Sequence, residues 1–175
     1  MIIAVWAVPV VCLGALGNRI RGGLWPIPGG DVPARLLGWG IPCAVIALAA
    51  GAGWWAAAVG LAAFLGCSVG EYGALSMGHR GGATGWRAWA GMGAFGLGRT
   101  ALVAGVVWWL GGAWLAVLIT GLIAPAIYDL AWRVPLWACL PGLGRGDGPP
   151  LYDPPELAEA LHGAIMALAL FLALA

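Results

Sequence analysis

Long apolar runs, separated by short segments that collect the polar residues, dominate the pattern of this chain. These runs cover residues 1–17, 36–52, 54–70, 113–132 and 157–175. Each is 17 to 20 residues long, close to the length with which an α-helix crosses the hydrocarbon core of a bilayer. Because a backbone in lipid must satisfy its own hydrogen bonds, the runs predict transmembrane helices.

The first run differs from a secretory signal peptide. A signal carries its positive residues before the apolar stretch, whereas Arg19 and Arg21 follow it here. We therefore expect a retained first helix with the N-terminus outside.

The stretch 100–124 admits two assignments. As a single helix it gives five spans and places three tryptophans near the middle of the bilayer, although Trp prefers the interfaces. These are Trp108, Trp109 and Trp114. A break at Gly111 and Gly112 places all three at a turn and adds a span over 90–110. We expect six spans, with five as the alternative.

Composition supports a membrane protein. Hydrophobic residues make up 62% of the chain, charged residues 9%, and the mean hydropathy is +0.94, whereas a soluble domain carries about 25% charged residues. An ordinary soluble enzyme and a disordered chain are both excluded. The expected fold class is all-α: one polytopic transmembrane helical bundle over 1–175.

The charges are confined to three segments. Residues 18–35, 71–99 and 129–159 hold all eight Arg and all seven acids, and six spans place the three segments on one side. The positive-inside rule makes that side cytoplasmic, which predicts a multi-pass protein of the bacterial inner membrane. No basic surface suggests a nucleic-acid partner, so the expected partners are membrane lipids.

Arg99 is the first candidate for chemistry. It lies about 12 Å inside a helix that starts near residue 90, and ionisable groups within a membrane are costly and often functional. Glu71 and Asp129 are its candidate partners, and both are also candidate catalytic residues. The alternative is that Arg99 extends to the interface, or that the helix begins at Thr100.

Two glycine-rich basic segments are further candidates. Arg19 and Arg21 lie in a predicted turn over 17–23, where guanidinium groups could bind phosphate or an anionic lipid headgroup. His79 and Arg80 lie in a second turn over 76–85, as a candidate general base and anion clamp. The alternatives are a simple positive anchor and an exposed loop histidine.

Neither a metal nor a cofactor is expected. The glycines of 91–96 match a dinucleotide-binding pattern, but that pattern requires a preceding strand. Close helix packing explains them better, as it does the Gly66 and Gly70 spacing, and such faces could also support a homo-oligomer. Glu159 and His162 form half of a di-iron motif without a second half. The four cysteines are spaced for neither zinc nor disulfides.

The sequence resembles small membrane proteins of phages and prophages along most of its length. The motifs that carry this resemblance are Arg-x-Arg-Gly-Gly at 19–23, Met-Gly at 77–78 and a Pro-x-Glu-Leu helix start at 154–157. The family implies no activity. Residues 80–85 also resemble a cytoplasmic loop of bacterial membrane glycerol-3-phosphate acyltransferases, without its second lysine.

We therefore expect an integral inner-membrane protein with an anion-binding cytoplasmic face and no assigned reaction. The anion-binding residues would be Arg19, Arg21, Arg80 and Arg99. One alternative is a membrane enzyme that acts on a lipid phosphate or acyl group. Another is a small transporter, channel or holin-like pore.

Overall fold

The computed structural model describes residues 2–24, 27–77, 86–133 and 154–175, which are helical apart from short turns. The helices are α1 (Ile2–Leu24), α2 (Asp31–Arg35), η1 (Leu36–Gly40), α3 (Ile41–Ala49), η2 (Gly53–Trp55), α4 (Ala56–Ser76), α5 (Trp86–Trp109), α6 (Trp114–Arg133) and α8 (Pro154–Leu174). The predicted all-α class is therefore confirmed for the described part of the chain.

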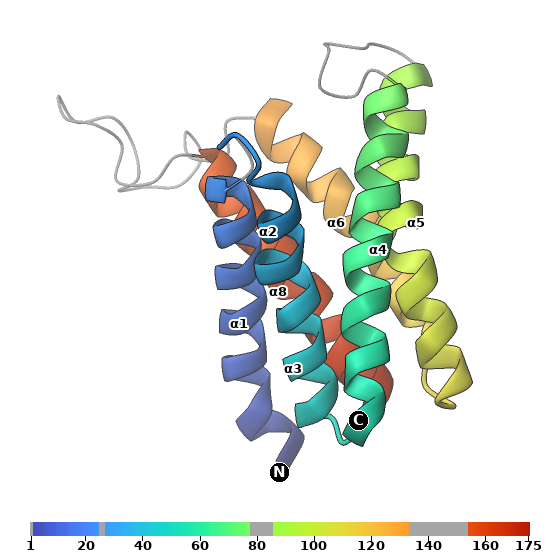
Figure 1. Ribbon diagram of the computed structural model, residues 1–175. Helices are drawn as coiled ribbons and strands as arrows, with labels where there is room; N and C mark the ends of the chain where they lie inside the picture. Colours follow the sequence, from blue (N-terminus) through green and yellow to red (C-terminus); the bar gives the residue numbers. More distant parts are fainter. Residues whose placement is uncertain (1, 25–26, 78–85, 134–153) are drawn as a thin grey trace, which may run out of the picture.

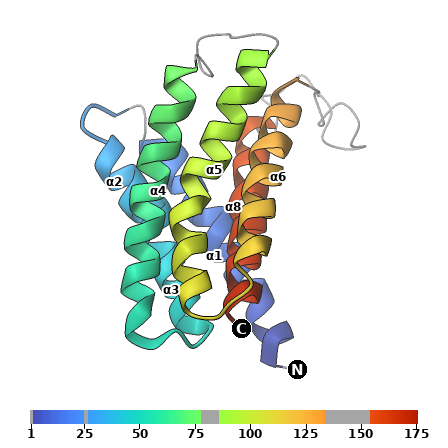
Figure 2. The ribbon, with the colours of Figure 1, turned by 90° about the vertical axis from the view of Figure 1, so that its right-hand side faces the viewer.

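The helices run up and down in one bundle (Figure 1). In chain order α1, α4 and α6 run one way, and the α2–α3 segment, α5 and α8 run back (Figure 2). Both termini lie at the same end of the bundle as the α3–α4 and α5–α6 turns, which we call the turn end. We call the opposite end the charged end. Helix α8 packs between α1 and α6 and also touches α3.

Four of the described segments are long and apolar enough to cross a membrane. They are Asp31–Ala49, Gly53–Ser76, Trp89–Trp109 and Leu157–Leu174. A shorter apolar helical stretch covers Trp114–Ile127. Large apolar side chains such as Leu61 and Val69 are exposed on the outer surface of the bundle, as expected where lipid replaces water. The chain is a helical protein compatible with membrane insertion.

The helix boundaries confirm one prediction and correct another. The break at Gly111 and Gly112 is confirmed: α5 ends at Trp109, and Gly111 adopts a φ of 77° that favours glycine. The predicted turn over 17–23 is wrong, because α1 continues to Leu24. Two adjacent glycines lower helix propensity, but the contacts of α1 with α8 and η1 outweigh that cost.

A π-helical segment, η1, joins α2 to α3 in one continuous helix. The N–H of Ile41 donates to the carbonyl of Leu36, five residues back. Pro42 follows directly, and it has no N–H to give to the carbonyl of Gly38. A locally wider turn accommodates the proline ring without breaking the helix. Trp39 lies in this segment and is almost fully buried.

Glycines set the closest helix contacts, as the spacing of Gly66 and Gly70 predicts. Both lie on α4 against the backbone of Arg99 on α5, where an added Cβ would collide. Gly14 and Gly163 make the same kind of contact between α1 and α8. Small residues allow this approach in membrane helices. The backbone around Arg99 is therefore held tightly between its neighbours.

Candidate functional site

A group of polar side chains is buried inside the bundle. The most buried polar residues are Asn18, Arg21, Arg35, Glu71, Arg99, Thr100 and His162. They come from α1, α2, α4, α5 and α8. Burying so many polar groups is unfavourable unless each is paired, so their partners show what the group can do.

Glu71 pairs with two arginines at once. Its Oε1 accepts from Arg21 Nη1 at 2.5 Å, and its Oε2 accepts from Arg35 Nε at 3.2 Å. Arg35 also lies 3.6 Å from the half-exposed carboxylate of Asp31. We call Arg21, Arg35 and Glu71 the shared-carboxylate cluster. It joins α1, α2 and α4.

Asn18 connects this cluster to Arg99. Its Oδ1 accepts from Arg21 Nε at 3.1 Å and from Arg99 Nη2 at 3.3 Å. Its Nδ2 donates to the backbone carbonyl of Glu159 on α8 at 2.6 Å. One neutral amide therefore links two buried cations and holds α1 against α8.

Arg99 is 1% exposed, and among the described side chains no carboxylate hydrogen-bonds to it. Its Nη1 lies 2.9 Å from His162 Nε2. Its guanidinium stacks on the indole of Trp39, with Cζ 3.9 Å from the ring centre, and lies 5.5 Å from the ring of Phe95. The Nε of Arg99 has no hydrogen-bond partner in the described structure, and neither has Nε1 of Trp39.

The contact with Arg99 defines the protonation of His162. An arginine side chain can only donate hydrogen bonds, so His162 Nε2 must be the acceptor. A histidine that accepts at Nε2 is neutral and carries its proton on Nδ1. His162 therefore stabilises Arg99 without cancelling its charge.

Exposed tryptophans mark both ends of α5. Trp89 near its start and Trp108 near its end are 69% and 65% exposed. At 1.5 Å per residue they are separated by about 28 Å along the helix. Arg99 lies between them, about 15 Å from Trp89. Arg99 therefore lies further from the start of its helix than predicted, because α5 begins at Trp86.

The predicted site residues are only partly brought together. Arg99 and Arg21 share Asn18, but the expected pair of Arg99 with Glu71 is not formed, because Glu71 pairs with Arg21 and Arg35. Arg21 was expected at headgroup depth in a turn; it is instead helical and buried. Arg19 is exposed on the same helix.

Other candidates lie outside what the structure describes. His79 and Arg80 are outside the described residues, and Asp129 belongs to α6 without a described side chain. Within the described residues no group of three metal-ligating side chains occurs. The Nε2 of His162, half of the di-iron motif, is taken by Arg99.

Sequence reasoning missed Asn18, Arg35 and Trp39 as parts of the site. Asn18 is the only asparagine of the chain, and no glutamine occurs; it lies one helical turn before Arg21. Trp39 stands between two glycines, three residues before Pro42 of α3. A lone amide in an apolar helix is a usable signal, since such a group requires an internal partner.

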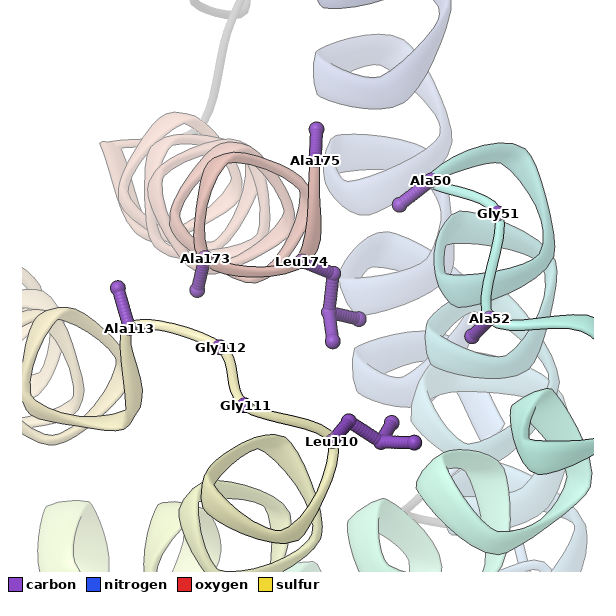
Figure 3. Close-up of a pocket in the computed structure, with 10 residues that line it drawn as sticks. All are labelled: Ala50, Gly51, Ala52, Leu110, Gly111, Gly112, Ala113, Ala173, Leu174 and Ala175. Atoms are coloured by element: carbon purple, nitrogen blue, oxygen red, sulfur yellow. The ribbon is translucent and has the colours of Figure 1, made fainter.

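The turn end offers a different kind of space. A cavity of about 430 Å³ lies between the two turns and the end of α8 (Figure 3). It is lined by Ala50, Gly51, Ala52, Leu110, Gly111, Gly112, Ala113, Ala173, Leu174 and Ala175. None of these side chains is charged or polar, so the polar groups that face the cavity belong to the backbone.

In comparisons with known proteins, no family model, curated protein or solved structure matches this chain. Its function must therefore be argued from the site itself.

Proposed function

We propose that this chain is a polytopic protein of a bacterial inner membrane that binds an anionic group at Arg99. The proposal includes six spans, an external N-terminus and a cytoplasmic charged end. It also includes a phage or prophage origin. This part rests only on the glycine-rich segments and the start of the last helix, which resemble those of small phage and prophage membrane proteins.

The observation that carries the binding proposal is that no carboxylate of the described residues contacts the buried charge of Arg99. Its hydrogen-bonding partners are a neutral histidine and a neutral amide, and its Nε has no partner in the described structure. A buried cation costs several kcal/mol when it lacks a counter-charge. An anion that accepts from Arg99 would offset this cost.

The tryptophans of α5 support the membrane part of the proposal. Their separation of about 28 Å matches a hydrocarbon core of about 30 Å, and Trp residues gather at both interfaces. With Trp89 and Trp108 at the two interfaces, Arg99 lies near mid-bilayer. Ionisable groups at this depth face the bundle interior and mark ligand or ion pathways, as expected for an anion site.

Binding is tested by replacing Arg99. The purified protein is titrated with decanoate in a non-ionic detergent. In a second experiment it is placed in nanodiscs that contain phosphatidylglycerol, and binding of this lipid is measured. Arg99→Met should abolish saturable binding of whichever anion the wild type takes. The matched control is Arg87→Met, an exposed arginine on the same helix, which should bind as the wild type does. Equal binding by wild type and Arg99→Met would overturn the proposal.

The topology is tested separately. A reporter fused after Pro149 should respond as cytoplasmic, and one inserted at Gly111 as external. An external response after Pro149 would favour five spans. The opposite response at both sites would invert the orientation.

A further inference from the structure

Two buried N–H groups have no hydrogen-bond partner among the described residues. What we infer from them rests on the proposed function. Arg99 Nε and Trp39 Nε1 belong to side chains that are 1% and 2% exposed. Unpaired buried donors are uncommon in folded proteins, and each costs about 1–3 kcal/mol. Two of them on adjacent side chains point to a shared acceptor.

The two donors are close enough for one small ligand. The guanidinium carbon of Arg99 lies 3.9 Å from the centre of the Trp39 ring, and each donor nitrogen belongs to one of these two stacked groups. The two nitrogens therefore lie on one pair of contacting groups, and an oxyanion beside that pair would offer a separate oxygen to each. A carboxylate or phosphate matches the planar edge of an arginine particularly well.

The charges favour a ligand with a single negative charge. Arg99 contributes one positive charge that no described carboxylate contacts, whereas the two charges of Arg21 and Arg35 face two carboxylates, those of Glu71 and of the half-exposed Asp31. A dianion would introduce a second negative charge with no matching cation at Arg99. Carboxylates and phosphodiesters are the common biological oxyanions with one charge.

We propose that Arg99 Nε and Trp39 Nε1 together bind a singly charged oxyanion, a carboxylate or a phosphodiester, within the bundle. The π-helical segment η1 positions Trp39 for this purpose. Its indole covers the guanidinium with its face and offers its N–H at its edge. Trp39 then contributes to specificity, because an oxyanion offers a separate oxygen to each donor, whereas chloride offers a single atom to both.

The test is Trp39→Phe, which retains an aromatic face for Arg99 and removes the N–H. Isothermal titration measures the affinities for decanoate and chloride in detergent, and native mass spectrometry measures phosphatidylglycerol retained from nanodiscs. The variant should bind the oxyanion at least about tenfold more weakly, as expected for a lost hydrogen bond to a charged group. Its preference for oxyanion over chloride should fall as well.

A matched control separates this role from a structural one. Trp89→Phe changes an exposed tryptophan of α5 and should leave affinity and preference unchanged. The melting temperature of each ligand-free variant reports on folding. A Trp39→Phe variant with a lower melting temperature but the wild-type preference would show a packing role and overturn the inference.

The remaining outcomes distinguish the inference from the proposed function. Binding that requires Arg99 but is unaffected by Trp39→Phe would refute the donor pair and leave the anion site standing. No anion binding by the wild type would refute both. Between the two sources, saturation by decanoate alone identifies a free carboxylate, and retention of phosphatidylglycerol alone identifies a lipid phosphodiester.

Discussion

The two halves of the buried polar network solve the same problem in opposite ways. In the shared-carboxylate cluster, Arg21 and Arg35 both contact Glu71. On the other side of Asn18, Arg99 contacts a neutral histidine, a neutral amide and two aromatic rings. The first half contains a carboxylate that contacts its arginines, whereas no described carboxylate contacts Arg99 in the second half.

The difference suggests different purposes. A cation paired inside the fold holds helices together, and removing its partner leaves a buried charge alone. A cation surrounded by neutral groups keeps its capacity to bind an anion from outside the chain. Stability should therefore depend on Glu71, and binding should depend on Arg99.

The largest effect on stability is expected for Glu71→Gln. This change leaves Arg21 and Arg35 without their common buried carboxylate and should reduce the free energy of unfolding by about 3–5 kcal/mol. Denaturant-induced unfolding in mixed micelles measures it. Asp31→Asn is the control, since that carboxylate is half-exposed and should matter by less than about 1 kcal/mol. Similar losses in both variants would remove the distinction between buried and exposed pairing.

Gly70→Val should cost about 1–3 kcal/mol by overpacking. An added Cβ would lie 2.7 Å from the backbone nitrogen of Arg99, so α4 and α5 must separate. Gly105→Ala, on α5 with no atom within 4 Å of an added Cβ, should be neutral or slightly stabilising. Thermal denaturation compares the two, and an unchanged Gly70→Val would show that the close contact does not hold Arg99 in place.

Arg99→Met should have the smallest effect on stability, less than about 1 kcal/mol, in the absence of ligand. Replacing an uncompensated buried charge with an apolar side chain of similar size is often neutral or stabilising. The same unfolding experiment measures it beside Glu71→Gln. If both variants lose several kcal/mol, Arg99 is a structural residue and the two halves of the network do not differ.

Much of the fold follows from local patterns. Apolar runs of bilayer length predict the helical class, and paired glycines beside clustered tryptophans predict the break at Gly111 and Gly112. The turn over 17–23 was wrong because helix packing overrode the low propensity of Gly22 and Gly23. Local sequence contains no information about that packing.

The site is predictable only in part. A charge such as Arg99 within an apolar stretch is conspicuous, and its burial is confirmed. Its partners are distant in sequence: His162 is 63 residues away and Asn18 is 81. Which carboxylate pairs with which arginine depends on how the helices pack. The sequence alone therefore led to the wrong pairing of Glu71 with Arg99.

The most direct test of the central claim is to supply Arg99 with an internal counter-charge. Asn18→Asp places a carboxylate where Oδ1 now lies, 3.3 Å from Arg99 Nη2 and 3.1 Å from Arg21 Nε. Asn18→Ala is the control, because it loses the same donated bond to Glu159 without adding charge. The measurement is the titration of both variants with the anion that the wild type binds.

If Arg99 binds an external anion because no carboxylate of the described residues contacts it, Asn18→Asp should remain folded and lose binding by about tenfold or more, whereas Asn18→Ala should retain it. Wild-type affinity in a folded Asn18→Asp variant would contradict the account, since an internal carboxylate would then not compete with the ligand.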